Sequence, residues 1–422
     1  MNKTTTFVYL IAAIFAATQT TNAQRILTYE EFMKNVREKN IEYIVEKYEV
    51  SIAEANAQAA KVMPDPEFSV NYETYQDWDL RMGRGYVAEL DYTLELGGKR
   101  RARIAAAKSE QQMTEALVED FFRNLRADAT LCYLEALKQR QLVELALSSC
   151  QSMRNLARGD SLRYALGEIA EVDAMQSRLE ATIMMTDYLQ TELEYKNMLS
   201  DLVVFEGGTA TIDSLAGSLQ PVVRAYQLPY LIEQAQDNRA DLKAAIRNRE
   251  LSAANMKLAK ANRVIDLGLN VGFALSREAL TLDAGGNDEQ FKLYSVGVTI
   301  PLKFSNMNKG ELRAAQYSQQ QAEAMYDAVL LQIRKEVEQC YNNCISACRQ
   351  ADLLQKSTLN DAALILEKKK YSYARGESSL LEVLDAQRTT NEVYQSYCEA
   401  LFNANASLVK LCRAVGIWDV EF

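Results

Sequence analysis

Three cysteines form the most suggestive group of reactive side chains in the sequence, since Cys340, Cys344 and Cys348 recur at intervals of four residues. On a helix this spacing places them along one stripe, and deprotonated thiols bind soft metal ions. The alternative is that they are small packing residues. An internal repeat, described below, aligns Cys340 with Cys132, but the next two stripe positions in that half hold an alanine and an arginine. We therefore favour packing and predict no metal site.

The sequence offers no other arrangement of residues that supports catalysis. It contains no histidine, which removes the commonest general base and the commonest metal ligand. We find no nucleophile in a strand-to-helix elbow and no glycine-rich phosphate loop. Seven cysteines are an odd number and cannot complete a set of disulfides. We predict that the chain is not an enzyme, binds no cofactor and, with a net charge of -10, has no nucleic-acid partner.

The first residues have the form of a secretory signal peptide. Lys3 precedes an apolar run from Phe7 to Ala17, which is too short to cross a bilayer as a helix, and the small residue Ala23 suits cleavage before Gln24. The alternative is a retained N-terminal anchor. We expect residues 1–23 to be removed. The rest of the chain has no stretch of eighteen or more apolar residues, so any membrane insertion must use strands.

The rest of the chain is a tandem duplication. A shift of 208 residues aligns one block of the two halves and a shift of 209 aligns a later block, so a single inserted residue separates the blocks. Aligned pairs include Tyr86 with Tyr294, Cys132 with Cys340, Tyr164 with Tyr373 and Gly167 with Gly376. The predicted boundaries are 24–204 for the first repeat, 205–227 for a linker, 228–414 for the second repeat and 415–422 for a C-terminal tail.

Each repeat is predicted to contain a helix, two strands and then two long helices. The first helix covers Thr28 to Val62 and is stopped by Pro64 and Pro66. The four strands are predicted at 67–73, 86–96, 265–276 and 294–304, with polar turns at 76–85 and 277–290. Apolar and polar residues alternate in every strand, which is the period of a strand with one apolar face.

The length and alternation of these strands fit a path through a membrane. The apolar face would meet lipid, and Glu89, Asp91 and Asp266 would lie on the wet side. For any single strand the alternative is a water-soluble sheet covered by helices. Four strands cannot close a membrane barrel, because such barrels start at about eight strands and an open edge in lipid is prohibitive. We therefore predict that several chains pool their strands, and three chains supply twelve.

The predicted long helices also indicate that the chain does not fold as an ordinary globular domain. Residues 99–165 and 309–374 contain no proline and almost no glycine, so each is predicted to be one continuous helix of roughly 100 Å. Gly167 and Gly376 then reverse the chain into second helices at 168–203 and 378–414. Such long hairpins cannot bury themselves in an ordinary globular domain.

Several short motifs inside this duplicated frame resemble one known family. They are Arg239-Ala240-Asp241-Leu242, in which Ala240 replaces the usual proline, Ile300-Pro301-Leu302, and the run from Tyr373 to Arg388. In this order, over nearly all of the mature chain, they resemble the TolC-like outer-membrane efflux factors. The segment Leu96-Gly97-Gly98-Lys99-Arg100, with Arg103, is similar to the subgroup that serves heavy-metal pumps. It is also readable as a glycine turn followed by a basic girdle near lipid headgroups.

The resemblance implies a fold that is mainly α with a membrane β-barrel contribution. Each chain would contain the helix-strand-strand-helix-helix repeat twice. Three chains would together form a 12-stranded β-barrel continuous with a 12-helix α-barrel tunnel. The protein would lie in the outer membrane of a Gram-negative cell, in contact with outer-membrane lipid, and project into the periplasm. It would be a passive exit duct that docks onto a periplasmic adaptor and an inner-membrane pump, of the RND type. The alternative is a trimeric coiled-coil scaffold or adhesin without a pore.

The resemblance also implies two functional regions. The tips of the hairpins, Tyr164-Ala-x-Gly167-Glu168 and Tyr373-Ala-x-Gly376-Glu377, would dock the adaptor. Carboxylates on the final helix would converge at the tunnel's constriction, and the matching residues are Glu382 and Asp385, whose spacing puts them on one helix face. Asp173 and Gln176 are their counterparts in the first repeat. Without the motif, the alternative is a solvated helix face. Ser378 replaces a basic residue that helps to hold the closed state.

Overall fold

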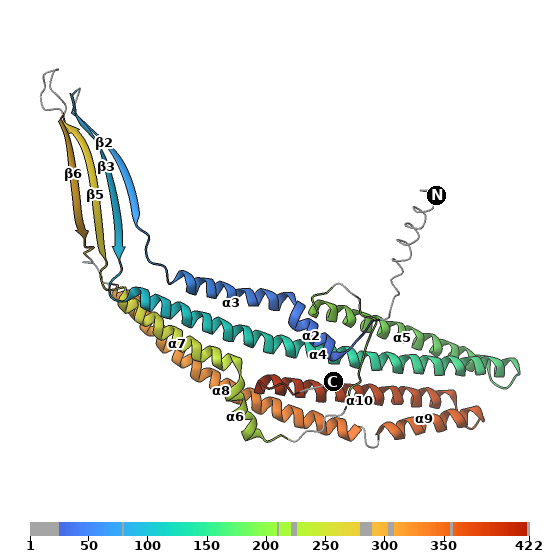
Figure 1. The fold of residues 1–422 in the computed structure, drawn as a ribbon. Coiled ribbons are helices and arrows are strands. Elements are labelled where there is room, and N and C mark those ends of the chain that lie inside the picture. Colours follow the sequence, from blue (N-terminus) through green and yellow to red (C-terminus); the bar gives the residue numbers. More distant parts are fainter. Residues whose placement is uncertain are drawn as a thin grey trace, which may run out of the picture. The chain divides into compact units, whose positions relative to one another are not determined.

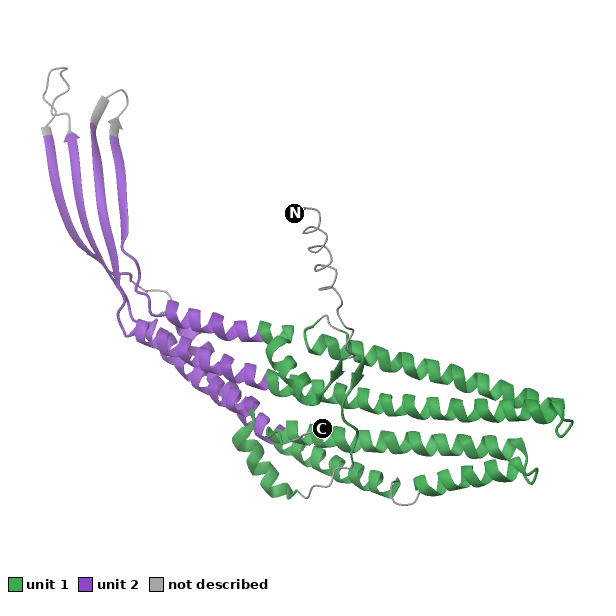
Figure 2. Cartoon of the chain, turned by 45° about the vertical axis from the view of Figure 1, so that its right-hand side comes forward, with its two compact units in different colours: residues 1–45, 121–239, 333–422 green, residues 46–120, 240–332 purple. Residues whose placement is uncertain are grey.

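The computed structural model describes residues 25–77, 80–208, 211–220, 226–278, 289–302, 308–354 and 358–419. The predicted signal peptide and the centre of the predicted turn at 277–290 lie outside these residues. The described residues form fifteen helices and strands, most of which are labelled in Figure 1, and the chain divides into two compact units (Figure 2). Unit 1 comprises residues 1–45, 121–239 and 333–422, and unit 2 comprises residues 46–120 and 240–332. Each unit therefore combines a part of both sequence repeats.

Unit 2 contains a four-stranded antiparallel sheet with the order β2-β3-β5-β6. The strands are β2 (Glu67–Asp77), β3 (Leu80–Leu94), β5 (Leu267–Glu278) and β6 (Glu289–Thr299). Pairing of β3 with β5 joins the two repeats, because Ala88 lies opposite Phe273 and Tyr86 opposite Leu275. A residue's cross-strand partner points to the same face, so the sequence alternation continues across all four strands.

The strand boundaries predicted from the sequence were partly wrong. The predicted polar turn at 76–85 is mostly strand, because polar side chains do not prevent backbone pairing, and Gly85 pairs with Glu73 and with Ser276. At the two ends of the predicted turn 277–290, β5 continues to Glu278 and β6 begins at Glu289, while the residues between them lie outside the described ones. At the other end β6 stops at Thr299, two residues before Pro301, which has no N–H to donate to a ladder.

The predicted apolar face of the sheet is confirmed and is uncovered in the single chain. Phe68 is 70% exposed and Val296 is 83% exposed. Tyr72 and Tyr86 pack against each other across two strands, with ring centroids 5.0 Å apart, and Phe273 and Tyr294 do the same at 5.3 Å. The outward side chains thus contact one another within the sheet, but no described part of the chain buries them.

Unit 1 holds the largest hydrophobic core. Here β1 (Ile26–Leu27) pairs in parallel with β4 (Ser214–Leu215), which belongs to the predicted linker. The Tyr133 hydroxyl lies 3.1 Å from the carbonyl oxygen of Leu27 and 2.8 Å from that of Ala216. Its ring stacks on Phe32, so one buried tyrosine fastens the start of the described chain and the linker to the long helix α4 (Lys99–Ala165).

The single helix predicted over Thr28 to Val62 is two helices, α2 (Tyr29–Lys39) and α3 (Ile41–Ala59). Asn40 ends the first in an extended conformation and caps the second, since its side-chain Oδ1 accepts a hydrogen bond from the Tyr43 N–H at 2.9 Å. Its Nδ2 donates to the carbonyl oxygen of Phe205 at 3.0 Å. Asn40 therefore interrupts the predicted helix, because the Tyr43 N–H and the Phe205 carbonyl oxygen both form hydrogen bonds with its side chain at this position.

The first long helix, α4, has the predicted bounds and 67 residues. The second does not, because the segment 309–374 is divided into α8 (Lys309–Leu353) and α9 (Leu359–Ala374). Leu354 and Thr358, on either side of the undescribed residues 355–357, have the wider turn of a π-helix. A π-turn holds one residue more than an α-turn, and these two residues lie in the part of the second repeat where the sequence alignment requires one additional residue.

The remaining helices are α5 (Glu171–Phe205), α6 (Leu228–Asn238), α7 (Ala240–Ala261) and α10 (Leu380–Val415). Arg239, only 3% exposed, lies between α6 and α7 and donates to Glu336 Oε2 at 2.7 Å and to the Ala414 carbonyl oxygen at 3.0 Å. This contact connects the start of the second repeat to α8 and α10. None of the described helices is both long and apolar enough to cross a membrane.

Candidate functional site

The two hairpin tips in unit 1 are built in the same way. In the first, the Gly167 N–H donates to the Tyr164 carbonyl oxygen and the Glu168 N–H to that of Arg163. In the second, Gly376 and Glu377 make the same pair of bonds to Tyr373 and Ser372. This is the Schellman arrangement, which needs a left-handed residue at the helix end. The glycines have φ angles of 76° and 77°, as the sequence predicted.

The two tip tyrosines, although equivalent in sequence, have different environments. Tyr164 is 43% exposed, whereas Tyr373 is 7% exposed. The Tyr373 hydroxyl donates to Asp160 Oδ1 at 2.9 Å, and the Arg163 guanidinium lies over its ring at 5.3 Å. Burial, with the Asp160 bond as a second cause, raises the pKa of Tyr373 to about 12. The second hairpin is therefore joined to the first through this tyrosine.

Asp160 is a site residue that the sequence analysis missed. It lies on α4 and is 1% exposed, and its Oδ2 has no hydrogen-bond partner among the described residues. Its nearest cation is Arg163, at 3.9 Å. A signal was available, because the shift of 209 aligns Asp160 with Lys369, and opposite charges at one repeat position indicate that the two copies have different roles.

The predicted constriction residue Glu382 lies in the first turn of α10. It completes a capping box in which Ser379 Oγ accepts from the Glu382 N–H, while the Glu382 carboxylate accepts from the Ser379 N–H. The Lys369 ammonium contacts the other carboxylate oxygen at 2.5 Å. The hydrogen bond from Lys369 is the largest cause that lowers the pKa of Glu382. The carboxylate is thus ionised and remains 46% exposed.

The other predicted constriction residues are less constrained. Asp385 is 64% exposed and pairs with Arg388 Nη2 at 2.8 Å on the same helix. Asp173 and Gln176 lie in the first turns of α5 and are half-buried. The charge of Asp173 contributes to the raised pKa of Tyr373, so the two are neighbours. Of the three carboxylates of the predicted site, Glu382 and Asp385 therefore have basic partners within the chain.

Ser378, the predicted departure from the family pattern, is half-buried beside the second tip. Its hydroxyl lies 3.5 Å from the Lys369 carbonyl oxygen. Next to Lys369, Lys370 Nζ donates to Ser152 Oγ on α4 at 2.6 Å, and burial lowers the pKa of this lysine. Bonds between the hairpins in this region are thus made by Lys370 and Tyr373.

The cysteines of the α8 stripe lie among packed side chains. Cys344 is buried, and Cys340 and Cys348 are half-buried. Burial raises the pKa of the Cys344 thiol to about 11, so it is protonated at neutral pH and disfavoured as a metal ligand. The described residues contain no group of three cysteine or carboxylate side chains placed to hold a metal ion. Their arrangement supports no chemistry beyond packing.

Known proteins that are similar to this chain are outer-membrane efflux and metal-resistance proteins. Residues 231–417 match the family model described as outer membrane efflux protein. The chain is 22% identical over 390 residues to the cobalt-zinc-cadmium resistance protein CzcC of Cupriavidus metallidurans, covering 92% of this chain and 90% of that protein. It is 21% identical over 294 residues to the outer membrane protein TolC of Vibrio cholerae, covering 67% of this chain and 66% of TolC.

The fold is similar to solved structures of the same kind. The crystal structure of CusC superposes with a TM-score of 0.74 at 17% identity, covering 92% of both chains. That of the outer-membrane channel OprN gives 0.75 at 16% identity, covering 95% of this chain and 94% of OprN. The second half of the chain thus matches the outer membrane efflux protein family, and most of the chain is similar to TolC-like outer-membrane efflux proteins, the family that its sequence resembles.

Proposed function

We propose that three copies of this chain form a passive exit duct, with a 12-stranded β-barrel in the outer membrane and a 12-helix tunnel in the periplasm. The observation that carries the proposal is the sheet of unit 2. Its apolar face is exposed, and its outer strands β2 and β6 each pair on one side only among the described residues. Open strand edges and a bare apolar face are both unfavourable in a lone chain in water; pooling strands between chains pairs the edges, and insertion into lipid covers the apolar face.

A seam on α5 supports association through the helices as well. Six of its large apolar side chains are between 45% and 70% exposed, and they form two runs, 172–183 and 189–193, with spacings of three or four residues within each run. They are Val172, Met175, Leu179, Ile183, Leu189 and Leu193. Residues three and four apart lie on one helix face, so this seam would bury itself against a neighbouring copy. A coiled-coil scaffold without a pore would use such a seam but would leave the apolar sheet without a role.

The hairpin tips are proposed to dock a periplasmic adaptor, which links the duct to an inner-membrane pump of the RND type. Tyr164, Glu168 and Glu377 are exposed and available to a partner. Two tips per chain present six similar surfaces in a trimer. Because the energy source resides in the pump, the duct itself carries out no catalytic step.

The constriction is proposed to be formed by Glu382 and Asp385, with Asp173 and Gln176 contributing a weaker ring. Three-fold symmetry would bring six carboxylates around one axis and favour the passage of cations. Lys369 and Arg388 offset part of this charge within each chain. The printed name of CzcC points to divalent metal ions as cargo, and an acidic ring is compatible with such ions.

Two measurements test this function. The mass of the detergent-extracted protein should be that of a trimer, and a stable monomer that keeps its sheet would exclude the proposed architecture. In planar bilayers the trimer should conduct poorly, prefer cations and be blocked from the periplasmic side by multivalent metal ions. A preparation that inserts but conducts nothing under any ionic condition would favour the scaffold.

A further inference from the structure

A cavity of about 800 Å³ opens between α4 and α7 within unit 2. It extends along α4 from Gly97 to Ser109 and along α7 from Glu250 to Val264. This volume lies within the range of small-molecule sites in proteins. None of the predicted tip or constriction residues lines this cavity, so neither region accounts for it.

The end of the cavity next to the sheet is firmly built. Asp266 accepts from the Leu96 N–H at 3.1 Å and from Lys99 Nζ at 2.6 Å, which fixes the turn between β3 and α4. Gly97 has a φ of 70°, and a side chain there would meet Val264 at 2.5 Å. Gly97 thus allows Val264 to approach the turn closely, whereas a side chain at Gly98 would meet nothing within 4 Å.

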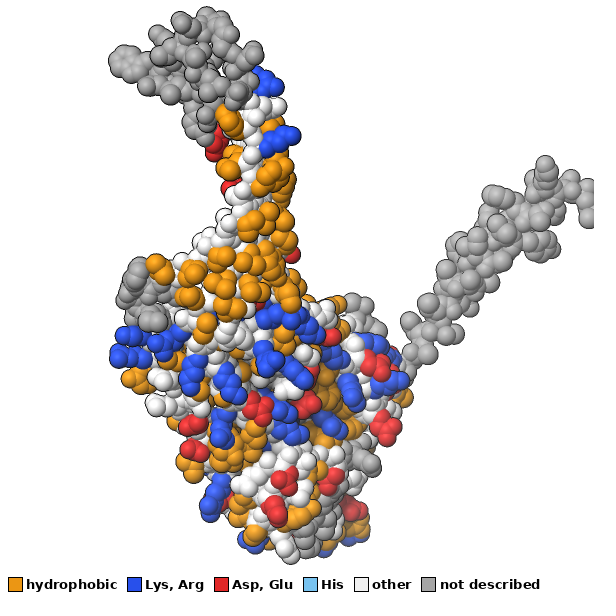
Figure 3. Space-filling view, turned by 60° about the vertical axis from the view of Figure 1, so that its left-hand side comes forward, with side chains coloured by type: hydrophobic (Ala, Val, Ile, Leu, Met, Phe, Trp, Pro, Cys, Tyr) orange, Lys and Arg blue, Asp and Glu red, His pale blue; other side chains and the backbone are white. Residues whose placement is uncertain are grey.

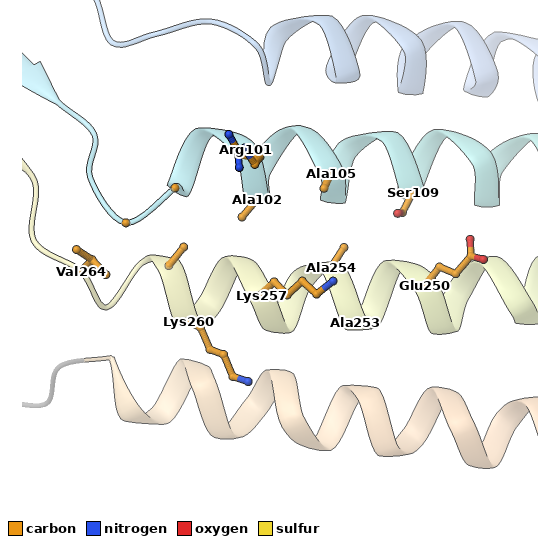
Figure 4. A pocket seen from close by; sticks show the side chains of 13 residues that line it. Arg101, Ala102, Ala105, Ser109, Glu250, Ala253, Ala254, Lys257, Lys260 and Val264 are labelled. Carbon is orange, nitrogen blue, oxygen red and sulfur yellow. The ribbon is translucent and has the colours of Figure 1, made fainter.

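The walls of the cavity are apolar and made of small residues. In Figure 4, Ala102 and Ala105 of α4 and Ala254 of α7 face one another across it, and Lys257 lies along α7. Arg101 and Lys260 extend from its two edges. An apolar interior with charged edges suits an amphiphilic ligand better than a bare ion.

The charge of the cavity is positive and uncompensated. No described residue forms a hydrogen bond or ion pair with the side chain of Arg101, Lys257 or Lys260. The single lining carboxylate, Glu250, is already paired with Arg247 at 2.7 Å. By contrast, the neighbouring Lys99 and Arg103 are bound to Asp266 and Glu95. Three free cations therefore remain for an anionic ligand.

The cavity lies where the strands end. On the face drawn in Figure 3, hydrophobic side chains cover the strands and basic side chains gather below them. Leu94 and Leu267, the last residues of β3 and the first of β5, are separated from the cavity residues Gly97 and Val264 by two residues each. A membrane that surrounds the strands would thus present its headgroups at the level of the cavity.

We infer that this cavity binds an anionic phospholipid of the periplasmic leaflet. Lys257 contacts the phosphate, Arg101 and Lys260 at the two edges add positive charge around the headgroup, and the alanines contact the glycerol and the first methylenes of the acyl chains. This inference rests on the proposed insertion of the strands into the membrane. A basic side chain near an anionic lipid surface gains about fivefold in binding, so three give on the order of a hundredfold when fully engaged.

The test is native mass spectrometry of the delipidated trimer with added phosphatidylglycerol or phosphatidylcholine. Wild-type protein should retain phosphatidylglycerol, up to one per chain, and not phosphatidylcholine. The variant R101Q/K257Q/K260Q should bind phosphatidylglycerol between ten- and a hundred-fold more weakly. The control R154Q/R158Q/K335Q removes three exposed basic residues of unit 1 and should bind like the wild type. Equal losses in both variants would reduce the effect to net charge and overturn the inference.

Two further arms separate the remaining outcomes. Inorganic phosphate should not displace the lipid at equal concentration, and displacement would assign the cavity to a free anion. The variant A105L/A254L keeps every charge but fills the cavity, so it should also lose the lipid. If A105L/A254L binds phosphatidylglycerol like the wild type, the inference is overturned, even if R101Q/K257Q/K260Q fails to fold. Conductance of the same preparation is the separate test of the proposed function: a wild-type trimer that conducts but retains no phosphatidylglycerol contradicts only this inference.

Discussion

The contact between Tyr373 and Asp160 gives the sharpest test of how the two hairpins are held together. Tyr373→Phe removes one hydroxyl and leaves Asp160 Oδ1 without its donor. The carboxyl group is 1% exposed, its Oδ2 has no partner among the described residues, and Arg163 is 3.9 Å away. A hydrogen bond to a charged group contributes about 1.5–3 kcal/mol, and water cannot replace it at a buried site. The loss should therefore fall at the upper end of that range.

Amide hydrogen exchange measures this loss locally. If α9 opens by separation from α4, a change of about 1.5–3 kcal/mol speeds exchange of the protected amides of α9 by roughly ten- to a hundred-fold. Tyr164→Phe is the matched control, because this repeat counterpart is 43% exposed. Asp160→Asn keeps an acceptor but removes the charge, so adding it to Tyr373→Phe should cost less than the sum of the two single changes.

The same contact has a pH window. The pKa of Tyr373 is raised from the ordinary 10.0 to about 12, so its protonated form is favoured in the folded protein. The stabilisation is complete below pH 10 and is lost as the pH rises towards 12. An absorbance titration should find one late-ionising tyrosine that Tyr373→Phe removes. If Tyr373→Phe and Tyr164→Phe changed exchange in α9 equally, the argument from burial would be refuted.

Three further predictions concern the tips and the constriction. Valine at Gly167 and Gly376 should abolish export with the trimer intact, since left-handed backbone costs such a residue roughly 1–2 kcal/mol. The control Gly159→Ala, in α4, should be tolerated. Continued export by the two valine variants would contradict the tip assignment. Alanine at Glu382 and Asp385 should weaken cation preference and metal block in planar bilayers, and wild-type selectivity would place the constriction elsewhere. Because the pKa of Glu382 is lowered, its bond to Lys369 should persist above the ordinary value of 4.5 and be lost as the pH falls below it; Lys369→Met should remove this acid dependence of α10 exchange.

The repeated elements of the fold were predictable because their residues follow regular periods. Alternation in the strands and the absence of proline from 99 to 165 indicate a sheet and a long helix without further information. Gly167 and Gly376 were predictable for a local reason, since a helix reversal needs left-handed backbone. In each case the information lies within a few neighbouring residues.

The errors arose where partners distant in the sequence decide the structure. Asn40 breaks a helix because the Phe205 carbonyl oxygen accepts its amide N–H, and no local pattern identifies that partner. Asp160 is buried because Tyr373, on the other hairpin, provides its hydrogen bond. The identical motifs at the tips likewise conceal that Tyr373 is buried and Tyr164 exposed. The strands that continue beyond their predicted ends are a further case, because backbone pairing continues through polar residues wherever a partner strand is present.

The π-turn between α8 and α9 has a consequence for the symmetry of an assembly. Two nearly identical hairpins per chain, repeated in three chains, would give a six-fold ring. An extra residue inserted into a regular α-helix would rotate everything beyond it by about 100°. A wider turn such as the one marked at Leu354 and Thr358 would offset such a rotation, so that two hairpins could keep comparable faces while differing in detail. A ring of three such chains would have three-fold rather than six-fold symmetry, and a partner that bound it six times would have to recognise two alternating kinds of site.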